Sequence, residues 1–288
     1  MDLPIRRLLQ PRSLEEALQW LEEIPDARAV AGGTDLVVQL RDGRRKAAAV
    51  VDLGRLDLAG IREGDTGVEI GALTPMDTLA RDGRIADGWP ALAQAASLVG
   101  AWPIQCRATI GGNLANASPA ADTAPPLLVA DAALRLVSRR GQRTIPLRGF
   151  FRGPGQTLLE PGELIAAVWL PRPPSEAGAR AFERFVKVGP RREQIISVVS
   201  VALRVVLVDG VIRRAAVALG AVAPTPVRAG TVEAYLEGQR SSAAVRQRAA
   251  ALLQQDIAPI DDVRAPAAYR RVAAAVVLDR LLEEAGDA

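Results

Sequence analysis

The sequence has no histidine, one cysteine (Cys106), two lysines and only 3% aromatic residues. Without histidine, the chain cannot build a Ser-His-Asp or Cys-His nucleophile or a Cys/His zinc site. A lone cysteine can form no disulfide within the chain and cannot by itself hold an iron–sulfur cluster. Any chemistry on this chain must therefore come mainly from a bound cofactor.

Long apolar runs and basic stripes are also lacking. About 18 consecutive apolar residues are needed to cross a bilayer, and the nearest run, Ile195 to Val208, is interrupted by Arg204. Residues 1–13 contain no apolar signal core. The basic clusters Arg44-Arg45-Lys46 and Arg191-Arg192 are short, and no aromatic residues interleave with them. We therefore expect a cytoplasmic protein with no membrane span and no nucleic-acid partner.

The 288 residues are enough for two domains. The clearest linker, Pro171-Arg172-Pro173-Pro174-Ser175, divides the chain into residues 1–175 and 176–288. Strand and helix patterns before the linker predict two small α/β units, over about residues 1–55 and 56–175. The predicted fold class is α+β.

Three strand-like runs follow the linker: Arg180 to Val188, Ser197 to Val208 and Val211 to Gly220. Asp209-Gly210 is typical of a two-residue hairpin turn between the last two runs. The alanine-rich remainder from Thr231 has a helical pattern. The C-terminal domain is therefore predicted to be a three-stranded antiparallel sheet with a helical bundle.

Several local signals place elements in the first part of the chain. Ser13-Leu14-Glu15-Glu16 fits a capping box at the start of a helix. Thr74-Pro75 is expected to open another helix, with the proline at its first position. Arg28 to Ala31 is expected to form a brief buried strand.

Two glycine pairs are the most informative feature, in Ala31-Gly32-Gly33-Thr34-Asp35 and Thr109-Ile110-Gly111-Gly112-Asn113. Glycine permits positive φ and lets the backbone approach a ligand closely, and successive N–H groups can then converge on an anion. Gly32-Gly33 lacks the G-x-G-x-x-G spacing of a Rossmann site, and no Walker A loop is present. Each pair on its own could equally be a plain turn.

The second pair opens a string of small and amide residues, Ala108 to Asp122. Such a string would make a poor core element, whereas it suits a backbone that lies against a ligand. Thr109, Asn113 and Ser118 can hydrogen-bond phosphate or ribitol oxygens, and Asp122 can accept from hydroxyls. A tight surface loop is the alternative.

These strings closely resemble the FAD-binding medium subunits of the molybdenum hydroxylases, the carbon monoxide dehydrogenase and xanthine dehydrogenase family. The resemblance runs through nearly the whole chain in order and weakens only in about the last 50 residues. The supporting strings are Val51-Asp52-Leu53, Gly67 to Leu73, Phe150-Phe151, Leu158 to Glu163, Phe185-Val186-Lys187-Val188 and Arg191-Arg192.

The resemblance implies a PCMH-type FAD-binding domain, with FAD bound non-covalently between the two N-terminal units and its pyrophosphate held by both glycine strings. The implied cofactor-binding residues are Ala29, Val30, Ala31, Gly32, Gly33, Thr34, Asp35, Leu36, Val99, Thr109, Ile110, Gly111, Gly112, Asn113, Ser118, Asp122, Ile165 and Lys187. Val99 and Ile165 could instead be core residues, and Lys187 a surface lysine.

The sequence departs from the family where an Ile-Arg-Asn sequence usually precedes the second string. Here Ile104-Gln105-Cys106 stands in its place, with Arg107 retained. A thioether between Cys106 and the flavin is an alternative to an inert packing role for this cysteine. The chain also lacks the cysteine-bearing insertion that gives a few relatives an additional iron–sulfur cluster.

The function implied by the resemblance is electron transfer. A large partner subunit would hold the molybdenum–pterin centre, a small one the [2Fe–2S] clusters, and the complex would be a dimer of heterotrimers. FAD would pass electrons to an external acceptor such as NAD, a quinone or oxygen, with no catalytic side chain on this chain. Two alternatives remain: a stand-alone FAD-dependent oxidoreductase with its substrate at the flavin, and a degenerate, non-catalytic assembly module.

Overall fold

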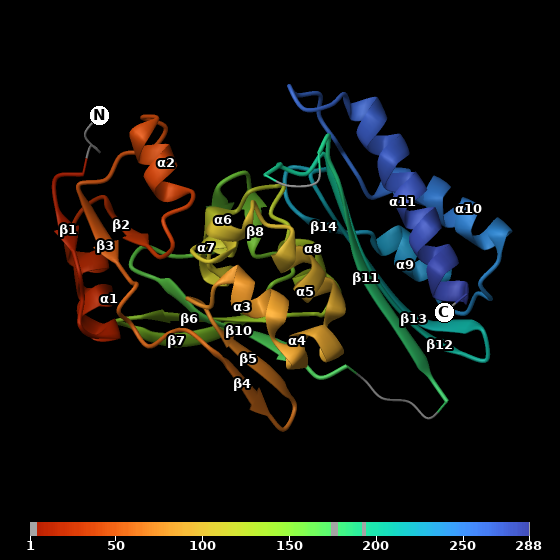
Figure 1. Cartoon of the computed structure of the whole chain (residues 1–288), viewed down its shortest axis with the longest axis horizontal. Helices are drawn as coiled ribbons and strands as arrows, with labels where there is room; N and C mark the ends of the chain where they lie inside the picture. The colour runs from red at the N-terminus through yellow and green to blue at the C-terminus, as the bar shows by residue number, and fades with distance from the viewer. Residues whose placement is uncertain (1–4, 174–177, 192–193, 288) are drawn as a thin grey trace.

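The computed structural model describes residues 5–173, 178–191 and 194–287. The chain forms three lobes in a row (Figure 1), which correspond to the N-terminal unit, the second unit and the C-terminal region. Pro174 and Ser175 of the predicted linker, and Arg192 of a basic pair, lie outside the described residues. The α+β fold class is confirmed.

The first lobe is a small parallel sheet with two helices. Its elements are β1 (Leu8–Leu9), α1 (Leu14–Glu23), β2 (Ala27–Val30), α2 (Leu36–Arg41) and β3 (Ala49–Asp52), and the strand order is β1-β3-β2. The Ser13 hydroxyl accepts from the Glu16 N–H at 3.1 Å, as a capping box requires. The Glu16 carboxylate, however, accepts from the backbone N–H of Arg12, one residue before the cap.

The expectation that strand β2 is buried was wrong. All four of its residues are partly or fully exposed, because β2 is an edge strand whose outer side faces a cleft.

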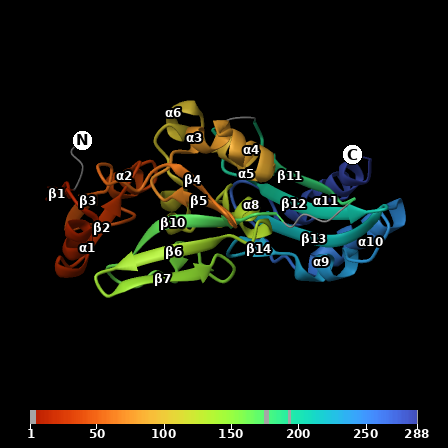
Figure 2. The same ribbon diagram turned by 90° about the horizontal axis from the view of Figure 1, so that it is seen from below.

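The second lobe is a five-stranded antiparallel sheet covered by short helices (Figure 2). The strand order is β4-β5-β10-β6-β7, formed by β4 (Ile61–Gly64), β5 (Gly67–Gly71), β10 (Leu164–Pro171), β6 (Ala133–Ser138) and β7 (Gly141–Pro146). A separate hairpin pairs β8 (Phe151–Gly153) with β9 (Gln156–Thr157).

The helices of this lobe are α3 (Met76–Arg81), α4 (Gly83–Gly88), α5 (Pro90–Ser97), α6 (Trp102–Gln105), α7 (Ile110–Asn116) and α8 (Ala124–Val129). Pro75 is the N-cap of α3, one residue before the position predicted for it.

The third lobe has the predicted long strands and one addition. The three long strands are β11 (Arg180–Val188), β12 (Val199–Val208) and β13 (Val211–Gly220); the short fourth strand is β14 (Val227–Arg228). Asp209 and Gly210 both have positive φ, 51° and 73°, which matches the predicted hairpin turn.

Its helices are α9 (Gly230–Leu236), α10 (Ala243–Leu252) and α11 (Ala267–Asp287), with a 3₁₀ turn at Leu253–Gln255. Within the described part of the chain, no helix is both long and apolar enough to cross a membrane.

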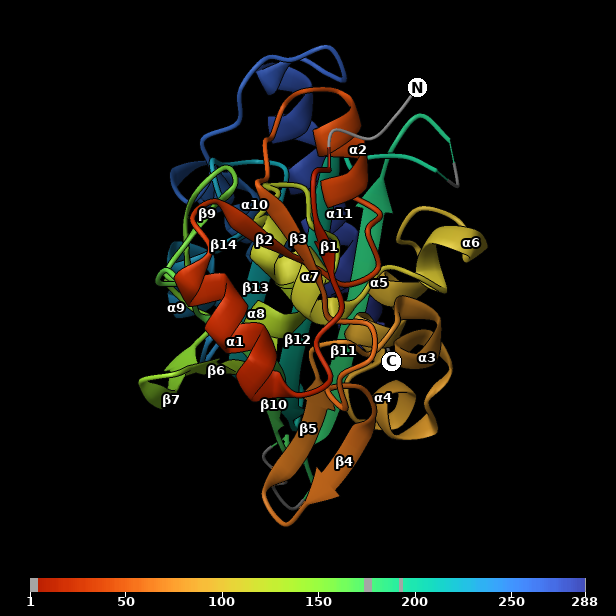
Figure 3. The same cartoon turned by 90° about the vertical axis from the view of Figure 1, so that its left-hand side faces the viewer.

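Apolar side chains join the lobes into one body. Alternation along β12 sends Ala202 into the central core with α5 and α8, and Val201 and Leu203 into a second core under α9 and α11. A third core joins the first lobe to the opposite side of β10 through Leu164 and Ala166. Figure 3, viewed from the first lobe, shows the three layers one behind another.

Candidate cofactor cleft

A cleft of about 1,320 Å³ is lined by residues of all three lobes. Its volume exceeds the roughly 300–1,000 Å³ of ordinary small-molecule sites, so it can accept an extended ligand. It is lined by every residue predicted from the sequence to bind the cofactor except Ile110 and Lys187. The third lobe contributes Gln194, Ile195, Ile196 and Arg264.

The first glycine pair forms the turn between β2 and α2. Gly33 has φ +76°, a conformation that favours glycine, and it lines the cleft. Gly32 packs against the start of the second string: a Cβ at this position would lie 1.7 Å from the carbonyl oxygen of Arg107, just before the string, and 3.1 Å from the nitrogen of Ala108. The first pair therefore has one glycine for the positive φ of the turn and one for close contact with the start of the second string.

The second glycine pair lies in the first turn of helix α7, rather than in an open loop. Thr109 caps this helix, its hydroxyl accepting from the Gly112 N–H at 3.1 Å. The Ile110 N–H donates to Thr74 at 3.1 Å and the Gly111 N–H donates to Ala72 at 2.8 Å. Because these two donors are already used, a simple nest of converging N–H groups is not what this string forms.

The two glycines of this pair also differ in their surroundings. A Cβ on Gly111 would lie 2.6 Å from the Ala72 Cβ, so this glycine permits close packing of α7 on the sheet. A Cβ on Gly112 would meet only the Thr109 hydroxyl, at 2.9 Å, and would otherwise point into open space. Ile110 is fully buried in the central core, so its side chain packs and does not face the cleft.

Helix α2, which follows the first string, is joined to the second string by a side-chain hydrogen bond. Gln39, on α2, donates to the Asn116 side chain at the end of α7, at 2.9 Å. The Asn113 side-chain oxygen accepts from the Thr123 hydroxyl at 2.6 Å, which fixes the amide beside the cleft. Polar side chains of the second string thus hold the string in place as well as face the cleft.

Asp122 and Lys187 form a buried ion pair across the lobe boundary. The Lys187 ammonium lies 2.6 Å from Asp122 Oδ2, and their side chains are only 4% and 9% exposed. Burial raises the pKa of the Asp122 carboxyl, while the Lys187 ammonium and the Ser197 hydroxyl oppose that rise. Asp122 lines the cleft and Lys187 lies behind it, so the lysine acts through the aspartate.

The apolar residues of the cleft lie at separate places. Val99 follows the end of α5, whereas Ile165 stands at the bulge of β10, and both face the cleft while touching the central core. The cysteine takes no part: Cys106 is absent from the cleft lining, although Ile104 and Ala108 on either side belong to it.

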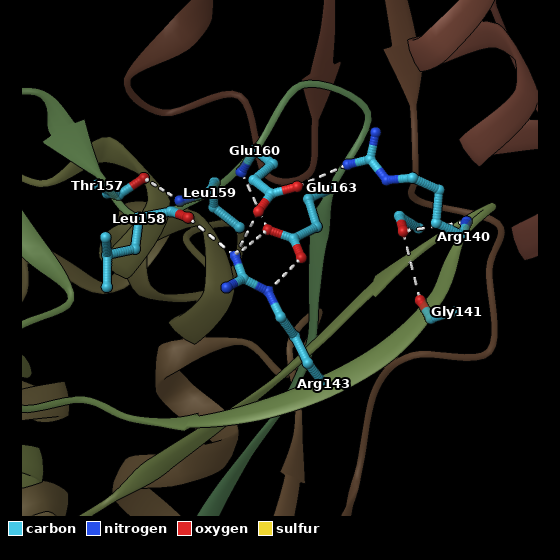
Figure 4. Close-up of polar contacts among 9 residues, drawn as sticks. Arg140, Gly141, Arg143, Thr157, Leu158, Leu159, Glu160 and Glu163 are labelled. Carbon is cyan, nitrogen blue, oxygen red and sulfur yellow. Dashed lines mark hydrogen bonds and ion pairs between the residues drawn. The ribbon is translucent and has the colours of Figure 1, made fainter.

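An ionic cluster holds the segment of the cleft wall at residues 158–163 (Figure 4). Arg143 of β7 binds both carboxylate oxygens of Glu163, at 2.7 and 2.8 Å, and donates to the Leu158 carbonyl at 3.0 Å. Arg140 reaches Glu160 at 2.8 Å. Arg143 holds the pKa of Glu163 below its ordinary value. The cluster fixes the segment 158–163, most of which lines the cleft.

Some cleft residues had not been predicted from the sequence. They include Gln39, Arg45, Arg152, Gln194, Ile195, Ile196 and Arg264. Ser197, which binds Asp122 without lining the cleft, was missed as well. No residue spacing in the sequence predicts these positions, because the fold brings them together from distant segments. Only segment 158–163 carried a signal, as one of the strings that resemble the family.

Comparison with known proteins agrees with this architecture. The FAD-binding domain of molybdopterin dehydrogenase matches residues 4–173, and the CO dehydrogenase flavoprotein C-terminal domain matches residues 184–285. The chain is 32% identical to the xanthine dehydrogenase FAD-binding subunit of Escherichia coli O157:H7, over 95% of this chain and 93% of the relative.

One further relative and one solved structure support the same family. The carbon monoxide dehydrogenase medium chain of Afipia carboxidovorans is 33% identical, over 96% of this chain and 95% of its own length. In the solved structure of reconstituted CO dehydrogenase from Oligotropha carboxidovorans, one chain matches with a TM-score of 0.94 at 30% identity, covering 100% of this chain and 99% of that one. The present chain therefore belongs to the FAD-binding medium subunits of the carbon monoxide and xanthine dehydrogenase family of molybdenum hydroxylases.

Proposed function

We propose that this chain is the electron-transfer subunit of a molybdenum hydroxylase complex and holds FAD non-covalently in the cleft. The bound FAD would supply the redox chemistry, taking electrons from [2Fe–2S] clusters and passing them to an external acceptor such as NAD, a quinone or oxygen. The observation that carries the proposal is that both double-glycine strings, about eighty residues apart in sequence, line the same cleft.

The residues present fit a dinucleotide. Gly112 is the position where a side chain would intrude on the cleft, and Gly33 provides the positive φ of the turn that lines it, as expected for a backbone that approaches a pyrophosphate. Asp122 offers carboxylate oxygens to ligand hydroxyl or N–H groups. Val99 and Ile165 supply apolar surface at separate points of the same cleft.

The proposed binding set follows from this fit. The first string, Ala29 to Leu36, and the second, Thr109 to Asn113 with Ser118, enclose the pyrophosphate and its neighbours. Lys187 supports the site through Asp122. Ile110 contributes by packing α7 on the core, not by contact with the cofactor. The binding domain is proposed to span residues 1–175 and the C-terminal domain residues 176–288, boundaries that accord with the two matched ranges.

The proposed partners are a large subunit with the molybdopterin and a small subunit with the clusters, assembled as a dimer of heterotrimers. The names of the relatives, which are subunits or medium chains of dehydrogenases, support a multi-subunit assembly.

Purification and spectroscopy test the proposal. The purified chain should show the visible absorbance bands of an oxidised flavin, and acid precipitation should release all of that flavin into the supernatant. A large molybdenum subunit and a small cysteine-rich subunit should co-purify with the chain when it is isolated from the organism that produces it. A colourless chain that FAD cannot reconstitute would instead indicate a non-catalytic assembly module. A yellow chain that turns over a substrate alone would indicate a stand-alone oxidoreductase.

A further inference from the structure

Asp122 is held by residues of a different lobe from its own. It follows α7 in the second lobe, yet the two described side chains that bind its carboxylate, Lys187 and Ser197, belong to the third lobe. The Ser197 hydroxyl donates to Asp122 Oδ1 at 2.5 Å, and the Lys187 ammonium donates to Oδ2 at 2.6 Å. Ser197 itself is fully buried.

Among the described residues, each carboxylate oxygen of Asp122 thus receives one hydrogen bond, and each donor is a residue that does not line the cleft. A carboxylate oxygen can accept about two hydrogen bonds, so each oxygen keeps acceptor capacity for a donor in the cleft. Two bonds to two different oxygens also fix the plane of the carboxylate, which one bond cannot do. Lys187 is the one charged group among the described residues that acts on the pKa of Asp122.

The backbone holds Ser197 rigidly. The Gln194 N–H donates to the Gly100 carbonyl at 2.9 Å, and the Val198 N–H donates to the Val188 carbonyl at 2.9 Å. Ile195 and Ile196, between these two anchors, line the cleft. The position of the Ser197 hydroxyl is therefore set by the docking of the third lobe on the second.

We propose that Ser197 is a positioning residue for the cofactor: its hydroxyl orients the Asp122 carboxylate toward the cleft and so makes FAD retention depend on the docked third lobe. The proposal rests on the proposed function, because it takes FAD as the occupant of the cleft. Nothing in the resemblance to the family pointed to this serine, which lies outside the two glycine strings.

A matched pair of variants tests the proposal in the full-length chain. Ser197→Ala removes the hydroxyl that binds Asp122. Ser200→Ala is the control, since Ser200 is equally buried three residues further along, and its hydroxyl has no hydrogen-bond partner among the described residues. FAD affinity is measured by fluorescence titration of the flavin-free proteins at several acidic to neutral pH values.

The Ser197→Ala variant should bind FAD about tenfold more weakly, the effect of losing one hydrogen bond to a charged group. Its loss of affinity on acidification should begin at a higher pH than in the wild type, because Asp122 loses a hydrogen bond that stabilises its ionised form. The Ser200→Ala variant should match the wild type in both measurements. Ser197→Thr, which restores a hydroxyl, should recover part of the affinity.

The outcomes separate this inference from the proposed function. Wild-type affinity and an unmoved pH profile in Ser197→Ala would overturn the positioning role while leaving the FAD assignment intact. Equal losses in Ser197→Ala and Ser200→Ala would also overturn it, because the effect would then belong to any buried hydroxyl of this segment. A wild-type chain that does not bind FAD would overturn the proposed function itself.

Discussion

Gly32 lies directly against the carbonyl oxygen of Arg107, so closely that a Cβ at position 32 would come within 1.7 Å of that oxygen. This contact joins the turn after β2 to the residues just before the second glycine string. The four glycines of the two pairs consequently have different tasks. Gly32 and Gly111 let backbone segments pack together, Gly33 provides the positive φ of its turn, and Gly112 leaves the cleft open.

Replacing Gly32 with alanine should destabilise the flavin-free protein. The new methyl group would meet backbone atoms of Arg107, which cannot rotate away, so the two strings must separate. Overpacking of this kind costs about 1–3 kcal/mol, and the loss should appear as a lower thermal unfolding temperature. An unfolding temperature equal to that of the wild type would show that the two strings are not in contact as described.

Gly112→Ala should have the opposite profile. Its methyl group would meet only the Thr109 hydroxyl, so the free energy of unfolding should fall by no more than the roughly 1 kcal/mol that a helix N-cap contributes. FAD affinity should nevertheless fall at least tenfold, because the side chain points toward the cleft, and Gly112→Val should abolish FAD retention. Flavin retained at full occupancy in the valine variant would contradict the assignment of this glycine to the cofactor.

Gly33→Val should also lose FAD, but this variant combines an effect on binding with an effect on stability. A residue other than glycine at φ +76° carries a backbone strain of about 1–2 kcal/mol wherever the ligand lies. Loss of flavin in this variant is therefore interpretable only beside its unfolding temperature, and Gly112 is the better position for separating binding from stability.

The sequence predicted the parts of the fold that depend on local patterns. The strands of the third lobe, the turn at Asp209-Gly210 and the helix start at Ser13 all follow from periodicity and turn or cap chemistry. The two-residue strand β14 escaped prediction because so short a run has no periodicity to detect. The strand at Arg28 to Ala31 was expected to be buried, but β2 is an edge strand, and its alanine and valine residues line the ligand cleft.

The candidate site was predictable only where it is continuous in sequence. The two glycine strings could be recognised, but their separate tasks could not, since contacts such as Gly32 with Arg107 exist only in three dimensions. For the same reason, Asp122 and Lys187 were each expected near the flavin without being expected to pair with each other. Ser197 gave no signal at all, because one serine at the start of an apolar run is unremarkable.

Glu163→Gln should lower the free energy of unfolding and reduce the affinity for FAD. The glutamine cannot accept both bonds from Arg143, and losing a charge-assisted pair that is partly open to solvent should cost about 1–2 kcal/mol. Because Arg143 lowers the pKa of Glu163, the stabilisation is present above the ordinary glutamate pKa of 4.5 and is lost as the pH falls through the lowered pKa.

The control for this variant is Glu160→Gln in the same cluster. The Glu160 and Arg140 side chains are more than half exposed, and such surface pairs contribute about 0–1 kcal/mol. Chemical denaturation near neutral pH should therefore separate the two variants. Equal effects would show that Glu163 is not the residue that braces segment 158–163.

Single replacement of the cysteine should leave the cofactor unaffected. Cys106 does not line the cleft, so Cys106→Ser should retain the flavin content of the wild type. Acid precipitation should release the flavin equally from both proteins. Flavin that stays with the acid-precipitated wild-type protein and is released from the serine variant would show a thioether bond at this position.

The last prediction concerns Glu183, a buried carboxyl of β11 that faces the start of helix α5. Its Oε1 accepts from the Ala91 N–H at 3.2 Å, and Arg204 lies 3.4 Å from Oε2. Burial raises the pKa of Glu183 to about 7. The folded protein therefore binds a proton that the unfolded chain releases at about pH 4.5, so stability should decrease as the pH rises between these values and level off above about 7.

The absence of histidine makes this effect visible, because few other groups of the chain titrate in that interval. The unfolding temperature of the flavin-free protein should fall between about pH 5 and about pH 7.5, and Glu183→Gln should remove most of the slope. Asp122, whose pKa is also raised by burial, is checked with Asp122→Asn in the same series. A slope that survives in Glu183→Gln and disappears in Asp122→Asn would assign the pH dependence to the cofactor site instead of the seam between α5 and β11.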